Sequence, residues 1–155
     1  MAECMSARLL NILLVEDNLD HAELLRRTLE QFPAANALHH VEDGEAALDY
    51  IFGRGNFVDR AQFPAPDLVL LDLRLPRLDG LDVLRHVRSH PTCHRTPIVV
   101  LTTSDADHDV AAAYEYQANG FVSKPVDAQR LALLVQQLDC GGLGRIGQPS
   151  FDGNL

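Results

Sequence analysis

The sequence predicts an α/β domain, a doubly wound (βα)5 arrangement with a five-stranded parallel sheet and helices on both faces. Short apolar runs alternate with segments of helical periodicity, which indicates strands joined by right-handed crossover helices. The apolar runs are continuous, as is typical of strands buried on both faces. With 155 residues and 46% hydrophobic content, the chain can bury the core of one such domain.

The first part of the chain supplies two strands and two helices. Residues 9–15 form an apolar strand, and Asn18 is placed to cap the helix that follows. The buried side of that helix is marked by apolar residues at helical spacing, Ala22, Leu25 and Leu29. Residues 36–41 form a less apolar strand nearer a sheet edge, and residues 45–52 form the next helix after Asp43.

The rest of the chain repeats the pattern. Residues 67–71 and 98–101 are short apolar strands, separated by a helix over residues 81–89. The next helix covers residues 105–118, and the following Asn119 and Gly120 are expected to end it because both tolerate left-handed backbone. The last βα unit follows it, with a strand at residues 121–123 and a helix that Asp127 caps and that ends near Leu138.

Two segments fall outside the alternation. Residues 52–66 form a loop longer than the usual two to six residues, and we expect either a docking element or a plain surface insertion. Residues 140–155 hold five of the ten glycines and no apolar periodicity, which predicts a flexible tail. The expected organisation is therefore one domain over residues 9–139, preceded by a short extension at residues 1–8.

Composition excludes several classes of partner and site. The net charge of −9 and the scattered Lys and Arg residues argue against nucleic acid as a partner. Cys4, Cys93 and Cys140 contain no CxxC pair, so we expect neither a disulfide framework nor a zinc site, and the seven histidines are expected to face solvent. No apolar stretch has the length of a membrane span and the N-terminus does not resemble a signal peptide, which predicts a cytoplasmic protein without membrane contact.

Five polar residues stand at the ends of the apolar runs, namely Glu16, Asp17, Asp72, Thr102 and Lys124. Groups just beyond the carboxyl ends of parallel strands project into the crevice where open α/β sheets bind ligands. Carboxylates gathered there suit Mg²⁺, which prefers oxygen ligands together with a phosphate oxygen. Taken singly, each residue is also compatible with an ordinary solvated strand end; together they predict a site for a divalent cation and a phosphoryl group.

Asp72 is the candidate nucleophile of this site. An aspartate carboxylate can accept a phosphoryl group to form an acyl phosphate, and positioning and charge neutralisation lower the barrier. The Thr102 hydroxyl and the Lys124 ammonium are suited to stabilising two of the phosphoryl oxygens.

The motifs LLVEDN, LLDLRLPRLDG, VVLTTSD and GFVSKP, in this order, resemble the receiver domain of two-component response regulators over residues 9–138. The resemblance implies a flavodoxin-like fold of strand order 2-1-3-4-5. It also implies a signalling protein, not an enzyme, in which Asp72 takes a phosphoryl group from a phosphohistidine of a sensor histidine kinase. Glu16, Asp17, Asp72 and the main-chain carbonyl of Arg74 would hold Mg²⁺.

The resemblance further implies a conformational switch. Phosphorylation would draw Thr102 toward the phosphoryl group and let Phe121 turn into the space that it leaves. Many receivers carry Tyr at this position, and Phe121 is also compatible with a plain core role. The peptide bond before Pro125 is expected to be cis, and Arg74 and Ser104 are candidates for tuning dephosphorylation.

The long loop and the TTSD motif resemble the single-domain regulators that partner bacterial phytochromes. This predicts a stand-alone regulator in a light-sensing two-component system, with a bacterial phytochrome as the kinase. Its signal is expected to leave through the surface of the fourth helix, fifth strand and fifth helix, where Tyr114 and Tyr116 stand and where a homodimer or another partner would bind.

Three other classes of protein fit parts of the pattern. A phosphatase of the haloacid-dehalogenase type also uses an aspartate nucleophile with Mg²⁺, but its acid catalyst stands where this chain has Arg74. An FMN carrier would need a phosphate-binding loop after the first strand, and EDNLDH stands there instead. An interaction domain that is never phosphorylated is the third alternative.

Overall fold

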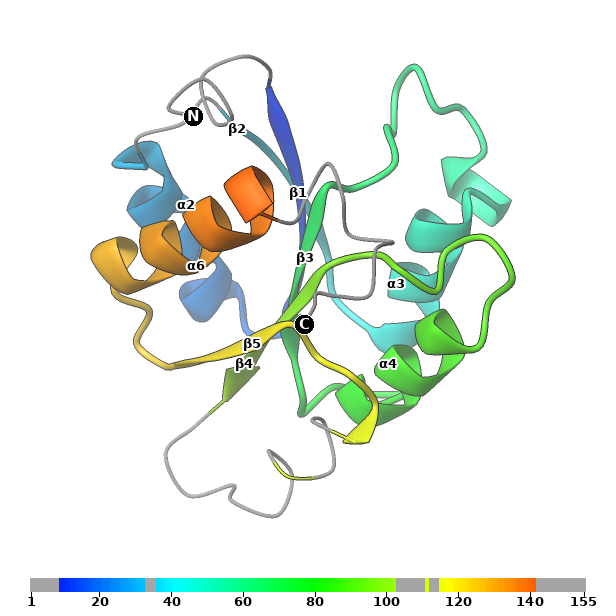
Figure 1. Cartoon of the computed structure of the whole chain (residues 1–155). Helices are drawn as coiled ribbons and strands as arrows, with labels where there is room; N and C mark the ends of the chain where they lie inside the picture. Colours follow the sequence, from blue (N-terminus) through cyan, green and yellow to red (C-terminus); the bar gives the residue numbers. More distant parts are fainter. Residues whose placement is uncertain (1–8, 33–35, 103–110, 112–114, 142–155) are drawn as a thin grey trace.

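The computed structural model describes residues 9–32, 36–102, 111 and 115–141. Five parallel strands form one sheet in the order β2-β1-β3-β4-β5, which confirms the predicted fold class and strand order (Figure 1). In chain order, the strands are β1 (Leu10–Val15), β2 (Asn36–Val41), β3 (Leu68–Asp72), β4 (Ile98–Thr102) and β5 (Gly120–Ser123). Because all five are parallel, their carboxyl ends lie at one edge of the sheet.

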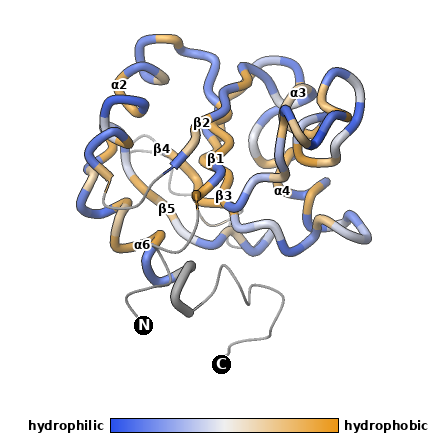
Figure 2. Tube along the Cα trace, turned by 90° about the horizontal axis from the view of Figure 1, so that it is seen from above, coloured by the Kyte–Doolittle hydropathy of each residue, from blue (hydrophilic) through white to orange (hydrophobic). Residues whose placement is uncertain are grey.

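Helices cover both faces of the sheet. On one face lie α2 (Leu19–Glu30) and α6 (Ala128–Gly141), and on the other lie α3 (Gly44–Phe52) and α4 (Gly80–Arg88) (Figure 1). Apolar residues concentrate on the strands between these two helical layers (Figure 2). In the described part of the chain, no helix combines the length and the apolar character that crossing a membrane requires.

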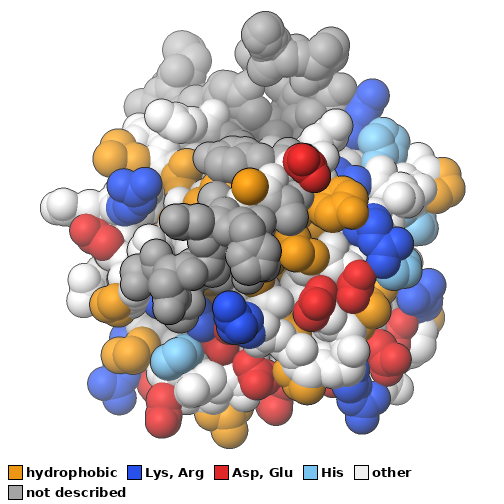
Figure 3. Space-filling model, turned by 90° about the horizontal axis from the view of Figure 1, so that it is seen from below, with side chains coloured by type: hydrophobic (Ala, Val, Ile, Leu, Met, Phe, Trp, Pro, Cys, Tyr) orange, Lys and Arg blue, Asp and Glu red, His pale blue; other side chains and the backbone are white. Residues whose placement is uncertain are grey.

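Three helices are capped at their N-termini by short polar side chains. Asn18 accepts hydrogen bonds from the main-chain N–H groups of Asp20 and His21, so α2 begins where the sequence predicts. Asp43 and Asp79 cap α3 and α4 in the same way. These three helices begin shortly after β1, β2 and β3, so their first turns lie at the carboxyl edge of the sheet. Figure 3 views the molecule from this edge.

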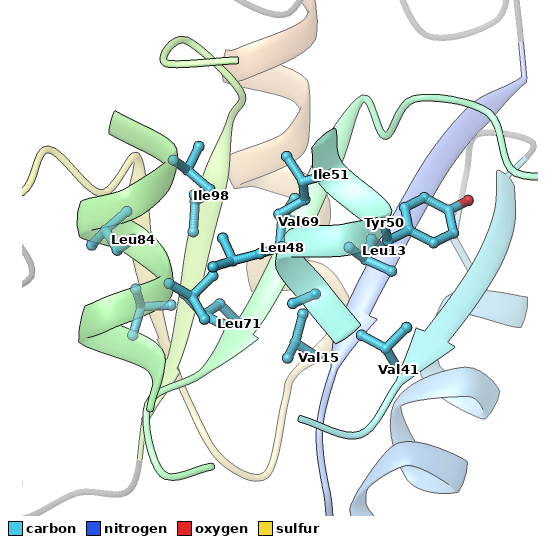
Figure 4. Packing of buried hydrophobic residues seen from close by; sticks show 14 of the residues in the cluster. Leu13, Val15, Val41, Leu48, Tyr50, Ile51, Val69, Leu71, Leu84 and Ile98 are labelled. Atoms are coloured by element: carbon cyan, nitrogen blue, oxygen red, sulfur yellow. The ribbon is translucent and has the colours of Figure 1, made fainter. Parts of the chain in front are cut away.

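Successive residues of each strand point to opposite faces, which divides the core into two clusters. In β1, Leu13 and Val15 pack toward α3 and α4, whereas Ile12 and Leu14 pack toward α2 and α6. The cluster under α3 and α4 also contains Tyr50, whose ring lies beside Leu13 (Figure 4). The strands are buried on both faces, as the continuous apolar runs indicate.

The loop after α3 is folded back onto that helix. Gly53 adopts φ 69° and ends α3. Arg60 donates hydrogen bonds to the carbonyl oxygens of Tyr50 and Phe63 at 2.9 and 3.1 Å. The ring of Tyr50 packs against Phe57 and Phe63, with centroid distances of 5.1 and 6.0 Å. The loop is thus part of the packed domain, and its role in docking stays a prediction.

The start of β5 differs from the sequence prediction. The left-handed residue is Gln117, with φ 65°, and not Asn119 or Gly120. Asn119 is instead hydrogen-bonded to the first residue of β4. Its side chain accepts a hydrogen bond from Ile98 N, and its own N–H donates to Ile98 O, both at 2.7 Å. Gly120 is the first residue of β5. α6 runs to Gly141, so residues 140 and 141 belong to this helix and not to the predicted tail. The extension at residues 1–8, Ser104, most of the predicted helix at 105–118 and the rest of the predicted tail, from residue 142, lie outside the described residues.

Candidate functional site

Three carboxylates meet at the carboxyl edge of the two central strands. Glu16 and Asp17 directly follow β1, and Asp72 is the last residue of β3. The two strands are neighbours and their ends are level, because Val15 pairs with Leu71. One oxygen from each carboxylate can be chosen such that all three lie within 4.8 Å of one another. The expected acidic cluster is therefore present.

An ammonium stands among these acids. Lys124 follows β5, and its Nζ donates hydrogen bonds to Glu16 Oε1 at 2.6 Å and to Asp72 Oδ2 at 2.8 Å. Glu16 and Asp72 are only 2% and 8% exposed, so both ion pairs lie in a largely dry environment. The ends of β3, β4 and β5 are level, because Asp72 pairs with Leu101 and Thr102 pairs with Ser123. The long side chain of Lys124, just after β5, therefore reaches the ends of β1 and β3.

Burial and pairing act on these groups in opposite directions. Burial raises the pKa of the Glu16 carboxyl, and the hydrogen bond from Lys124 only partly offsets this. Burial by itself would lower the pKa of Lys124, but its hydrogen bonds to Asp72 and Glu16 outweigh burial and leave the pKa raised. Lys124 is therefore an ammonium at neutral pH, and the raised pKa of Glu16 means that a nearby cation would stabilise its charged form.

The main chain fixes the orientation of Asp72. The N–H of Arg74 donates to Asp72 Oδ1 at 3.0 Å, so each carboxylate oxygen has its own donor. Gly80 lies directly under this segment, because a Cβ added to it would come within 2.5 Å of the Asp72 carbonyl oxygen. The N–H of Gly80 also donates to Leu73 O at 3.0 Å. The side chain of Arg74 is exposed, while its N–H helps to hold the acid.

Thr102 and Phe121 lie on neighbouring strands. Phe121 pairs with Val100 in the register of β4 and β5, and Thr102 stands two residues further along β4. Side chains two residues apart share a face of a strand, so Thr102 and Phe121 project from the same face of the sheet. Thr102 is 9% exposed at the strand end, and Phe121 is half-buried against the core under α3 and α4.

A hollow of about 230 Å³ joins these groups at the edge of the sheet. It is lined by all five predicted strand-end residues and Arg74, namely Glu16, Asp17, Asp72, Arg74, Thr102 and Lys124. Acidic, basic and histidine side chains are gathered on this edge of the molecule (Figure 3). The bond between Lys124 and Pro125 is cis. An aspartate that lines an open hollow, is paired with a cation and lies beside two further carboxylates can accept an electrophilic phosphoryl group.

The model of the response regulator receiver domain matches residues 12–136. The chain belongs to this family. Receiver domains are signalling domains that sensor histidine kinases phosphorylate. The match covers the whole described sheet apart from the first residues of β1, and it includes every residue of the hollow named above.

Several known proteins are similar to this receiver along most of their length. FilR2 of Methanothrix harundinacea, named a probable methanogenesis regulatory protein, is 38% identical over 127 residues, which cover 82% of this chain and 79% of FilR2. Response regulator Rcp1 of Synechocystis is 34% identical over 139 residues, covering 90% and 92%. The structure of its Mn²⁺-bound form has a TM-score of 0.68 and covers 90% and 99% at 34% identity. The bacteriophytochrome response regulator AtBRR has a TM-score of 0.75 at 39% identity, covering 84% and 93%.

Sequence reasoning missed one residue of the receiver's hollow. His21, in the first turn of α2, is exposed as expected, but its Nδ1 lies 3.2 Å from Lys124 Nζ. The sequence could have indicated His21 by its place in the first turn of the helix after β1, because that turn must lie near the carboxyl edge of the sheet. Its contact with Lys124, 103 residues away, follows only from the sheet order.

Proposed function

We propose that this receiver takes a phosphoryl group onto Asp72 from a phosphohistidine of a sensor histidine kinase, in a Mg²⁺-dependent transfer. The observation that carries the proposal is the environment of Asp72. Its carboxylate stands at the mouth of a hollow, with one oxygen held by the Arg74 N–H and the other by the Lys124 ammonium. A carboxylate oriented in this way is positioned for in-line attack on an incoming phosphorus atom.

The donor set fits Mg²⁺. Glu16, Asp17 and Asp72 offer oxygen ligands, and the carbonyl of Arg74 is the fourth candidate. The buried Glu16 already has a cation beside it in the form of the Lys124 ammonium, which supports a site that attracts positive charge. When bound, the metal ion supplies positive charge to a phosphoryl oxygen. The Mn²⁺ described for Rcp1 belongs to that protein and supports a divalent cation here.

The transfer is balanced as a single displacement. A carboxylate oxygen of Asp72 donates an electron pair to phosphorus and forms the new O–P bond. The P–N bond of the phosphohistidine breaks, and the departing imidazole keeps the electron pair of that bond and takes up a proton from water. Lys124 turns its ammonium from the Asp72 oxygen to a phosphoryl oxygen. The Thr102 hydroxyl donates to another, which spreads the developing charge over fixed donors.

Thr102 and Phe121 form the proposed switch. They project from the same face of neighbouring strands, so a movement of Thr102 toward the phosphoryl group opens space on the side of Phe121. Phe121 is half-buried against the core under α3 and α4, so an inward turn would bury the rest of its ring. The signal then leaves through the surface of β5, α6 and the segment before β5, where Tyr116 and Leu133 are 36% and 62% exposed and offer apolar contacts to a partner or a second copy.

The kinase is proposed to be a bacterial phytochrome in a light-sensing system. The similarity to AtBRR, a bacteriophytochrome response regulator, supports this pairing. The chain is 38% identical to FilR2, which is not named as a phytochrome regulator, and 39% identical to AtBRR. Sequence identity therefore does not choose the kinase, and phosphotransfer tests the pairing directly. An autophosphorylated bacterial phytochrome should transfer its phosphoryl group to this receiver faster than an unrelated kinase does. Equal or slower transfer contradicts the pairing and leaves phosphorylation of Asp72 intact. The cytoplasmic location stays a prediction of the sequence.

Intact-mass measurement tests the proposed function. Incubation with Mg²⁺ and acetyl phosphate should add one phosphoryl group to the protein, and Asp72→Asn should abolish the gain. Asp79→Asn is the matched control, because Asn can cap α4 as Asp79 does and the variant should still be phosphorylated. No gain in the folded wild-type protein would favour an interaction domain that is never phosphorylated.

A further inference from the structure

His21 touches the ammonium at the centre of the site. Its Nδ1 lies 3.2 Å from Lys124 Nζ and 3.9 Å from Glu16 Oε2. The imidazole is 45% exposed and lines the hollow beside the acids. None of the roles proposed above for the strand-end residues uses this side chain, although it lies against two of them.

The three N–H bonds of the ammonium each have one acceptor. Lys124 Nζ donates to Glu16 Oε1 at 2.6 Å, to Asp72 Oδ2 at 2.8 Å and to His21 Nδ1 at 3.2 Å. An ammonium has no lone pair, so Nδ1 can only be the acceptor in this contact, as in the tautomer that carries its proton on Nε2. Among these acceptors, only His21 carries no negative charge, and its contact is the longest.

The two carboxylates have a second task that His21 does not share. In the proposed function, Glu16 turns an oxygen to the divalent cation and Asp72 binds both the cation and the phosphoryl group. Both acids then become weaker partners for Lys124, because their charge is shared. The contact to Nδ1 at 3.2 Å can shorten as the ammonium moves away from Glu16, since it is longer than the usual distance for a charged donor.

We propose that His21 is a positioning residue that keeps the Lys124 ammonium at the phosphoacceptor site while Glu16 and Asp72 bind a divalent cation. The inference rests on the proposed function of the site. The imidazole is well placed for this task because the first turn of α2 is rigid. The side chain of Asn18 accepts the N–H of His21 at 3.1 Å, and Glu16 Oε2 accepts the N–H of Asn18 at 3.2 Å.

Substitutions of His21 test the idea through metal affinity. His21→Leu should weaken Mn²⁺ binding, followed by electron paramagnetic resonance, by about threefold to tenfold, the value of one net hydrogen bond. Without Nδ1, the ammonium depends on the same carboxylates that the cation needs. His21→Asn should restore affinity, because the Asn oxygen can take the place of Nδ1 as an acceptor. His86→Leu is the control, since the Nδ1 of this exposed imidazole hydrogen-bonds to a carbonyl of its own helix, Asp82 O, and not to the site.

A double-mutant cycle separates a direct contact from a change in the fold. In a Lys124→Met background, His21→Leu should have no further effect on Mn²⁺ affinity, because the ammonium is gone. Equal Mn²⁺ affinity of wild type and His21→Leu, failure of His21→Asn to restore binding, or an unchanged effect in the Lys124→Met background would each overturn the proposal. The cycle measures Mn²⁺ affinity and needs no phosphoryl donor. The proposed role of His21 can therefore be contradicted while the wild type is still phosphorylated, and it can hold if phosphorylation of Asp72 is not observed.

Discussion

Arg88, the last residue of α4, holds three separate segments together, and its removal should lower the stability of the domain. Its Nη1 donates to the carbonyl oxygens of His94 and Thr96 at 3.1 and 2.7 Å. Its Nε and Nη2 both donate to Gln117 O, at 3.1 and 2.9 Å, and Nη2 also donates to Asn119 Oδ1 at 2.9 Å. Burial lowers the pKa of Arg88 to about 10, so the guanidinium is charged at neutral pH.

The size of the effect follows from these five hydrogen bonds. A hydrogen bond from a charged donor contributes about 1.5–3 kcal/mol, and a carbonyl that loses its partner recovers part of this when water can reach it. Gln117 is exposed, so its carbonyl can recover water, whereas the other acceptors are half-buried. Arg88→Met, which keeps the apolar stem, should therefore lower the free energy of unfolding by roughly 2–4 kcal/mol.

Urea unfolding followed by circular dichroism measures this change. Arg88→Met should lower the midpoint of unfolding without changing the slope, because the same surface is exposed on unfolding. Arg85→Met is the matched control on the same helix: Arg85 forms an exposed ion pair with Asp82, and its loss should lower the free energy of unfolding far less than the loss of Arg88. A loss below about 0.5 kcal/mol for Arg88→Met, or equal losses for the two variants, would refute the reasoning.

Three further substitutions probe the site and the core. Burial raises the pKa of Glu16 above 4.5, so the stability of the wild-type domain falls as the pH rises above 4.5 and Glu16 loses its proton. Glu16→Gln should therefore be more stable than wild type at pH 7 and should lose this advantage near pH 4. It should also bind Mg²⁺ more weakly in calorimetry. Gly80→Ala should cost roughly 2–4 kcal/mol in urea unfolding, because its Cβ would meet the main chain at Asp72, and unchanged stability would contradict that close contact. The hydroxyl of Tyr50 is buried without a partner among the described residues, so Tyr50→Phe should raise the melting temperature, and a fall would show that the hydroxyl has a partner.

Within the described residues, most of the fold could be predicted from the sequence. Continuous apolar runs mark strands buried on both faces, and residues such as Asn18 and Asp43 mark the starts of helices. The differences are small: β3 includes Asp72 and β4 includes Thr102, because the hydrogen bonds between strands continue past the last apolar side chain. The prediction at Asn119 and Gly120 was wrong, because an Asn that tolerates left-handed backbone can also pair with a neighbouring strand.

The site could be predicted as a set of residues but not as a set of contacts. Glu16, Asp72 and Lys124 stand out because a polar residue ends an otherwise apolar run. Their hydrogen bonds join residues 52 and 108 positions apart, and these bonds depend on which strands are neighbours and on how their ends align. Local periodicity reports burial along one element and carries no information on the distance between two elements.

The sequence by itself determined the alternation of strands and helices, the helix caps and the polar residues that end each strand. Only the tertiary structure decided that Lys124 lies between Glu16 and Asp72, that His21 supplies its third acceptor, and that Arg88 ties α4 to the start of β5. The physical reason is the range of the interactions. Burial and capping act between near neighbours in the chain, whereas hydrogen bonds and ion pairs of this site require the packed sheet to bring distant residues within about 3 Å.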